Sequence, residues 1–142
     1  MIGAKDCARK YRENSILTAG PGTLVLMLFD GAIRAMGVAH AAFERSKTDF
    51  HRIEIINREL LKAQAIFTEL RGTLNHEIGG DYAKTMDPLY LYFKRRLIEA
   101  NMTKQLEPLA EVEQLFGTLR EAWADMLRNH DASESPRQML SA

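Results

Sequence analysis

Apolar residues recur at spacings of three and four through most of the chain, which is the period of a helix that buries one face. This pattern predicts four helices, at residues 21–45, 50–74, 81–101 and 105–128. The second has the clearest row: Ile53, Ile56, Leu60, Ala63, Phe67, Leu70 and Leu74. No segment alternates apolar and polar positions as a half-buried strand does. Short polar connections between these helices predict an all-α fold, an antiparallel four-helix bundle.

The first helix is expected to start with Gly20 as its N-cap and Pro21 as its first residue, where proline's missing N–H costs nothing. It carries more apolar surface than one buried face needs. One stripe consists of Leu24, Leu28, Gly31, Ala35, Val38 and Ala42, and a second of Phe29, Ile33, Met36 and Phe43. This helix is therefore either the central one or the one that offers a groove to a partner.

The third helix concentrates aromatic residues. Its core row is Met86, Leu89 or Tyr90, Phe93, Leu97 and Ala100. Tyr92 lies about 200° from Tyr90 around the helix, so both tyrosines cannot face the same core. At least one tyrosine should lie at an edge, either anchoring a partner or shielding the core. Pro88 is expected near the start of the well-formed helix, after a looser turn, and Asn101 at its end.

A short basic run, Lys94-Arg95-Arg96, follows these aromatic residues. A solvated face with an Arg95–Glu99 pair one turn apart is the simpler interpretation. Contact with an acidic partner is the alternative. The last helix repeats the bundle pattern, with a core row at Leu109, Val112, Phe116, Leu119, Trp123 and Met126.

Composition narrows the class of protein. The 142 residues include 19 basic and 19 acidic side chains, so the basic excess expected of a nucleic-acid binder is missing. A single cysteine, Cys7, excludes an intrachain disulfide and fits a reducing compartment. Met1–Lys10 lacks the apolar core of a signal peptide, and the longest apolar run, Leu24–Phe29, is far below a membrane span. We expect a cytoplasmic protein without a membrane span.

Candidate chemistry is sparse. The histidines are His40, His51, His76 and His130, and none has a glutamate three residues before it, as a di-iron bundle requires. His40 and Glu44 share a helix face, but two ligands on one helix make no metal site. We therefore expect no catalytic residues, no metal and no cofactor; a metalloenzyme is the least favoured class.

Several motifs, in consistent order over residues 11–127, resemble the FliS family of flagellin export chaperones. They begin with Tyr11-x-x-Asn14-Ser15 and the stretch Thr18-Ala19-Gly20-Pro21-Gly22-x-Leu24-x-Leu26-Met27-Leu28-Phe29-Asp30-Gly31. They continue with Lys62-Ala63-Gln64-x-Ile66, Glu69-Leu70, Leu89-Tyr90-x-Tyr92-x-x-Arg95-Arg96-Leu97-Ile98-Glu99-Ala100-Asn101 and Leu119-Arg120-Glu121-Ala122-Trp123.

The resemblance implies a cytoplasmic bacterial chaperone that binds the disordered C-terminal region of flagellin. It would prevent premature polymerisation and support delivery to the flagellar type III export gate. The residues expected to bind flagellin or line its groove are Leu24, Met27, Leu28, Tyr90, Tyr92, Phe93, Arg96, Leu97 and Asn101. A helical adaptor for another flagellar export component is the alternative.

The resemblance also implies three parts of the chain. Residues 1–19 would form an N-terminal cap segment that covers a groove until flagellin displaces it, with Tyr11, Ile16 and Leu17 as plugs. Residues 20–128 would form the bundle. Residues 129–142, rich in Ser, Asp, Glu and Pro without periodicity, are expected to be a disordered tail.

Overall fold

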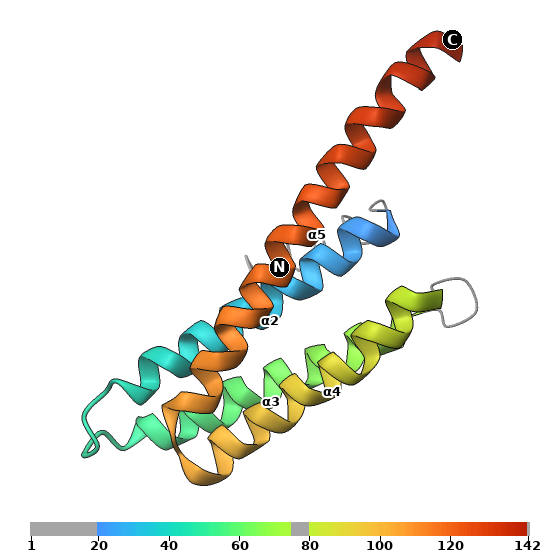
Figure 1. Ribbon diagram of the computed structural model, residues 1–142. Helices are drawn as coiled ribbons and strands as arrows, with labels where there is room; N and C mark the ends of the chain where they lie inside the picture. Colours follow the sequence, from blue (N-terminus) through green and yellow to red (C-terminus); the bar gives the residue numbers. More distant parts are fainter. Residues whose placement is uncertain (1–19, 75–79, 142) are drawn as a thin grey trace, which may run out of the picture.

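The structure is a computed structural model that describes residues 20–74 and 80–141, with residues 130–141 described by their backbone alone. It contains four helices, α2 (Pro21–Phe43), α3 (His51–Gly72), α4 (Gly80–Thr103) and α5 (Leu106–Ser141). Successive helices run in opposite directions, and α2 and α4 each pack against both α3 and α5 (Figure 1). The prediction of an all-α, antiparallel four-helix bundle is confirmed.

Four phenylalanines, one from each helix, form the centre of the core. Phe29 and Phe116 stack with ring centroids 4.5 Å apart, and Phe67 meets Phe116 edge-on at 5.0 Å. Phe93 completes the group at 5.8 Å from both Phe67 and Phe116. Offset and edge-to-face contacts are the favourable arrangements of aromatic rings. Because each predicted apolar row supplies one ring, the group joins all four helices.

Three residues of the predicted apolar rows lie largely outside the core. Val38, Ile53 and Met126 are 42%, 43% and 48% exposed. On α2 the buried positions include the alanines 32, 35, 39 and 42, whose small side chains let neighbouring helices approach closely. The alanine face of α2 is therefore the side that packs into the core, and Val38 lies beside it on the exposed side. On α4 the buried residue of the pair Leu89 and Tyr90 is Tyr90.

The predicted start of α2 is confirmed, whereas both predicted ends of α4 are wrong. Gly20 is the N-cap of α2 and Pro21 its first residue, as predicted. Helix α4, however, begins at Gly80 and continues through Pro88 instead of starting there. Pro88 and Lys84 are both exposed, so the carbonyl that loses its N–H donor lies on the solvent side of the helix.

Asn101 does not end α4, which continues to Thr103. The left-handed residue is Lys104, with φ of 52°. Its Nζ donates to both the carbonyl oxygen and Oδ1 of Asn101, at 2.5 and 2.6 Å, and to Oδ1 of Asn57 of α3 at 2.7 Å. Burial, together with nearby Arg52, lowers the pKa of Lys104. Asn101 therefore holds the α4–α5 connection.

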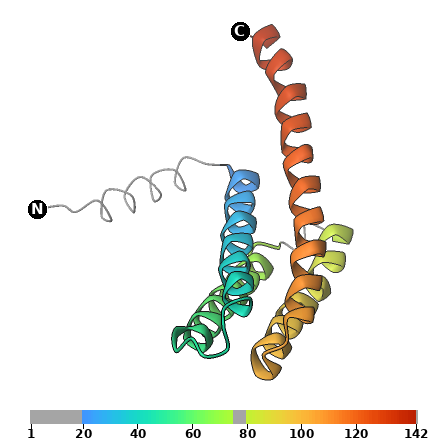
Figure 2. The same ribbon diagram turned by 90° about the vertical axis from the view of Figure 1, so that its left-hand side faces the viewer.

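Helix α5 is longer than predicted and projects beyond the other helices (Figure 2). The backbone of residues 129–141 continues the helix, where the sequence predicted a disordered tail. Elongating an existing helix adds one hydrogen bond per residue without a new nucleation step, and this favours continuation. The division into cap, bundle and tail stays a prediction, and residues 1–19, with Cys7, Tyr11, Ile16 and Leu17, lie outside the described residues.

By length and composition alone, α2 is a helix that could cross a membrane. The sequence analysis considered only the longest uninterrupted apolar run. Scattered polar residues interrupt α2, so that run is short although the helix as a whole is apolar. In the bundle, α2 places Phe29, Met36 and four alanines in the core and packs against α3 and α5. Burial within the protein accounts for part of this apolar composition, since 33% of the most apolar 18-residue window of α2 is buried.

Candidate protein-binding site

A cleft of about 330 Å³ opens between α2 and α3. The structure brings together here three residues expected to line a groove, Leu24, Met27 and Leu28, with Gly31 and Ile66 beside them. Leu28 and Ile66 also pack against the core, whereas Leu24 and Met27 are not among the described residues that do so. The cleft thus offers apolar side chains that the core does not use.

The polar edge of this cleft consists of Asp30 and Arg34. Arg120 of α5 holds Asp30 through two contacts, Nε to Oδ1 at 2.9 Å and Nη2 to Oδ2 at 3.4 Å. The hydrogen bond to Asp30 raises the pKa of Arg120. Arg34 is exposed and has no hydrogen bond or ion pair with any residue that the structure describes. The cleft therefore presents an apolar floor and one unpaired cation.

A second hollow, of about 410 Å³, lies where α2 begins and α5 leaves the bundle. Its lining is Pro21, Gly22, Val25, Thr73, Trp123, Met126 and Leu127. Trp123 donates from its indole nitrogen to the carbonyl oxygen of Gly22 at 2.9 Å. A Cβ at Gly22 would lie 2.5 Å from Cδ2 of Leu127, so glycine allows this close approach.

This second hollow was not predicted from the sequence. Met126 was assigned to the core, but it is 48% exposed and lines the hollow instead. The available signal was Trp123, the one tryptophan of the chain, near the end of a helix.

The aromatic cluster of α4 divides between core and edge. Tyr90, Phe93 and Leu97 are at most 1% exposed, so in this structure they support the bundle from within and do not line an open groove. Burial raises the pKa of Tyr90, with a further contribution from neighbouring Tyr82. Tyr92 lies half-buried on the side of α4 that faces α5 and donates a hydrogen bond to Glu111. The two tyrosines therefore lie on different sides, as their spacing indicated.

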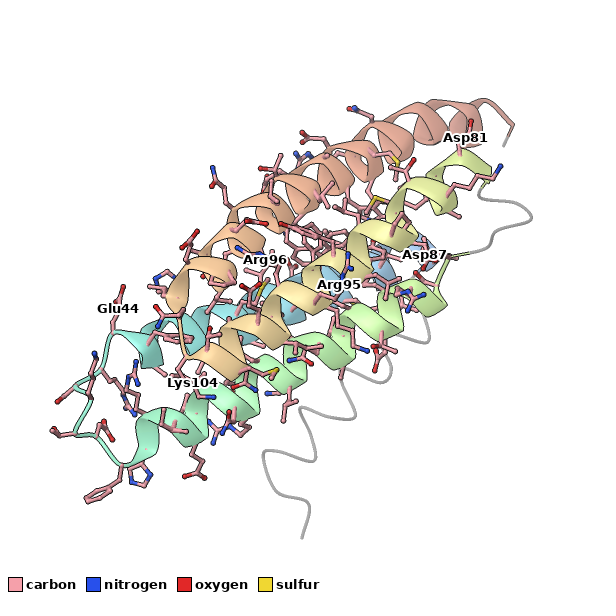
Figure 3. The ribbon with its side chains drawn as sticks, turned by 60° about the horizontal axis from the view of Figure 1, so that its bottom comes forward. Glu44, Asp81, Asp87, Arg95, Arg96 and Lys104 are labelled. Atoms are coloured by element: carbon pink, nitrogen blue, oxygen red, sulfur yellow. The ribbon has the colours of Figure 1, made fainter. Side chains whose placement is uncertain are left out.

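Arg96 connects α4 and α5 (Figure 3). Its Nη1 lies 2.6 Å from Oε2 of Glu99, and its Nη2 lies 3.1 Å from Oε2 of Glu111. The hydrogen bond with Glu99 raises the pKa of Arg96, and the one from Tyr92 lowers the pKa of Glu111. The expected Arg95–Glu99 pair is wrong: Glu99 pairs with Arg96, because α5 draws the Arg96 side of α4 into an ion-pair network.

His40 lies between two carboxylates. Its Nδ1 is 2.6 Å from Oε1 of Glu113 on α5, and its Nε2 is 3.3 Å from Oε1 of Glu44. The hydrogen bond with Glu113 raises the pKa of His40. Within residues 20–74 and 80–129, no three His, Cys, Asp or Glu residues are arranged to hold a metal ion. The predictions of no metal, no cofactor and no catalysis remain predictions.

Comparison with known proteins decides the family. The family model described as flagellar protein FliS matches residues 4–130. The chain belongs to the FliS family. It is 37% identical over 119 residues to the flagellar secretion chaperone FliS of Bacillus subtilis, covering 84% of each chain. It is 32% identical over 134 residues to FliS of Salmonella typhimurium, covering 94% of this chain and 96% of the relative.

A further relative is the flagellar secretion chaperone FliSB of Pseudomonas aeruginosa, 32% identical over 124 residues. Membership in the FliS family makes this chain a flagellar secretion chaperone and implies partners among flagellar proteins. The sequence-based resemblance is thereby confirmed at the level of the family. The family match ends at residue 130, close to the point where α5 projects from the bundle.

Proposed function

We propose that this chain binds the disordered C-terminal region of flagellin in the cytoplasm, prevents its premature polymerisation and supports its delivery to the flagellar type III export gate. The observation that carries this proposal is the apolar cleft between α2 and α3. Membership in a family of secretion chaperones supplies the context, and the cleft supplies a place for a client segment.

The binding mode follows from the shape of the cleft. An unfolded segment can form an amphipathic helix that lays its apolar face against Leu24, Met27 and Leu28. Folding on binding costs conformational entropy, so a large wrapped surface is needed for stable capture. Apolar side chains held in the cleft are unavailable to other flagellin molecules, which prevents polymerisation without any catalytic step.

Calorimetry with full-length and C-terminally truncated flagellin tests this proposal. We expect a stoichiometric complex with the full-length protein, micromolar or tighter, and none with the truncated one. The double variant Leu24→Ser/Met27→Ser should weaken binding by about tenfold or more, since burying each leucine-sized side chain contributes about 1.5–3 kcal/mol. Both residues lie outside the core, so the variant should fold.

Leu115→Ser is the matched control, because Leu115 is a 44% exposed apolar residue of α5 that does not line the cleft. Equal binding by the double variant and the control would exclude the α2–α3 cleft as the client site. Absence of any flagellin complex, together with binding to another export component, would instead support the adaptor function.

We further propose that residues 1–19 cover an apolar groove in the unoccupied chaperone, with Tyr11, Ile16 and Leu17 as plugs. This proposal rests on the family resemblance and on the cleft that starts near residue 24. Deleting residues 1–17 should raise the binding of an apolar dye and leave flagellin affinity equal or higher. Loss of flagellin binding on deletion would show that the segment is part of the site.

A further inference from the structure

The outer face of α4 carries a second apolar row, separate from the one buried in the core. Leu91, Ile98 and Met102 are 36%, 37% and 81% exposed. With Arg95 they follow the spacing i, i+4, i+7 and i+11, so the four residues form one line along the helix. A single exposed apolar residue needs no explanation, but an aligned row of them indicates a surface that meets a partner.

Helix α3 extends this surface. Nζ of Lys94 donates to Oγ1 of Thr68 at 2.9 Å, and Nζ of Lys104 donates to Oδ1 of Asn57 at 2.7 Å. Leu61, which is 58% exposed, lies between these two α3 partners, and the spacing of residues 57, 61 and 68 places the three on one line of the helix. We call the following four exposed apolar residues the outer strip: Leu61, Leu91, Ile98 and Met102.

The charges of α4 beside the outer strip that lack an ion pair within the described part of the chain are positive. Arg95 lies within the row and, like Lys84 about three turns earlier, has no ion pair with any described residue. Lys94, on the side facing α3, donates to a hydroxyl and not to a carboxylate. The carboxylates of Asp87 and Glu99 on the same helix are each paired with an arginine, and the remaining carboxylate of α4, Asp81, lies in its first turn, ten residues before Leu91. Exposed charges on the outer side of α3 are of both signs.

We propose that the outer strip binds an acidic amphipathic helix of a protein other than flagellin. Such a helix would place its apolar side chains on the strip and its carboxylates beside Lys94 and Arg95. A second copy of this chain fits less well, since its own outer strip would bring cations against cations. The α2–α3 cleft shares no residue with the outer strip, so a segment held in the cleft leaves the strip residues uncovered.

Fluorescence anisotropy with designed helical peptides tests the chemistry of the site. One labelled peptide of about 18 residues, five turns of helix, carries a leucine face bordered by glutamates, and its partner carries lysines in place of the glutamates. We expect the full-length protein to bind the acidic peptide roughly tenfold more tightly at low salt, with the difference shrinking as salt rises. Equal affinity for both peptides would overturn the proposal.

Variants locate the site. Leu91→Ser/Ile98→Ser should lose at least about tenfold in affinity for the acidic peptide, and Arg95→Glu should reverse the preference between peptides. Val38→Ser, at a 42% exposed apolar residue of α2, is the matched control and should bind normally. Unfolding midpoints like that of the parent protein would show that all variants fold. Wild-type affinity in Leu91→Ser/Ile98→Ser would overturn the proposal.

Photo-crosslinking identifies the natural occupant. A photoreactive phenylalanine at position 91 of the full chain, expressed in its own cells, should crosslink to an acidic helical segment of another protein. Crosslinks mainly to flagellin or to a second copy of the chain would overturn the proposal. Excess flagellin C-terminal peptide should leave the anisotropy signal unchanged, so failure at the outer strip is distinguishable from failure of flagellin binding at the cleft.

Discussion

At the scale of single residues, long-range polar contacts join helices that are distant in the sequence. His40 and Glu113 are 73 positions apart, and Asp30 and Arg120 are 90 positions apart. Each contact is partly exposed, and surface ion pairs contribute little to stability. Their main effect is on the register of α5 against α2, because they fix which residues of the two helices lie side by side.

The pKa of His40 makes part of this register dependent on pH. Because its folded-state pKa is raised above 6.5, chiefly by Glu113, its contribution to stability is fully present below about pH 6.5. That contribution is lost as the pH rises through the folded-state pKa. As the pH is raised from 6 to 8, we expect the thermal unfolding midpoint of the parent protein to decrease relative to that of His40→Gln. Thermal denaturation at several pH values measures this difference.

The control for this comparison is His51→Gln, since His51 is an exposed histidine whose Nδ1 lies 3.7 Å from Oε2 of Glu54 on the same helix. A parent protein and a His40→Gln variant with parallel pH profiles would contradict the role assigned to the His40–Glu113 contact.

At the scale of elements, each helix contributes one phenylalanine to a shared ring group, and the helices therefore depend on one another. Phe116 contacts the rings of Phe29, Phe67 and Phe93, so α5 touches the ring of every other helix through one side chain. The spacing of apolar residues within each helix gives that helix an apolar face. The stability of the bundle comes from packing these faces together.

Replacing Phe116 should destabilise the whole bundle. Phe116→Ala removes a fully buried ring and leaves a cavity between four helices, which costs about 3–5 kcal/mol. The neighbouring variant Leu115→Ala, at an exposed position, should change stability by less than about 0.5 kcal/mol. Urea denaturation followed by circular dichroism measures both. A Phe116→Ala cost as small as that of Leu115→Ala would show that the rings are not the centre of the core.

At the scale of the whole molecule, α5 serves two regions. Its first part completes the bundle and contributes Trp123 to the hollow at the start of α2, and its last part projects away from the other helices (Figure 1). Two neighbouring seams of the bundle differ as well: α2 and α3 form the apolar cleft with Arg34, and α3 and α4 carry the outer strip with Lys94 and Arg95. Under the two proposals, the cleft and the outer strip serve two different ligands.

Truncation after residue 129 tests the projecting part of α5. We expect the total helical signal of the chain to fall, because residues 130–141 are helical in the structure. The unfolding midpoint should stay the same, since the projecting backbone lies beyond the bundle (Figure 2). Far-UV circular dichroism and thermal denaturation measure both quantities. An unchanged helical signal would instead favour the disordered tail predicted from the sequence.

The sequence by itself determined the helical class, the four helices, the four phenylalanines and the family. Periodicity suffices for these because it shows which side of a helix is apolar relative to that helix's own axis. The preferences of glycine for the N-cap and of proline for the first helical position likewise predicted that α2 starts at Pro21. Helix ends near Pro88 and Asn101 were wrong because neighbouring helices stabilised turns that local preferences disfavour.

Only the tertiary structure decided which apolar side chains remain outside the core. Rotation of a helix against its neighbours is set by packing of all four helices, and this turned Val38 and Met126 outward while placing Tyr90 inside. The same packing chose Arg96 over Arg95 as the partner of Glu99. Leu24 and Met27 became a cleft, not core, because the space between α2 and α3 depends on contacts between distant residues, which no local pattern records.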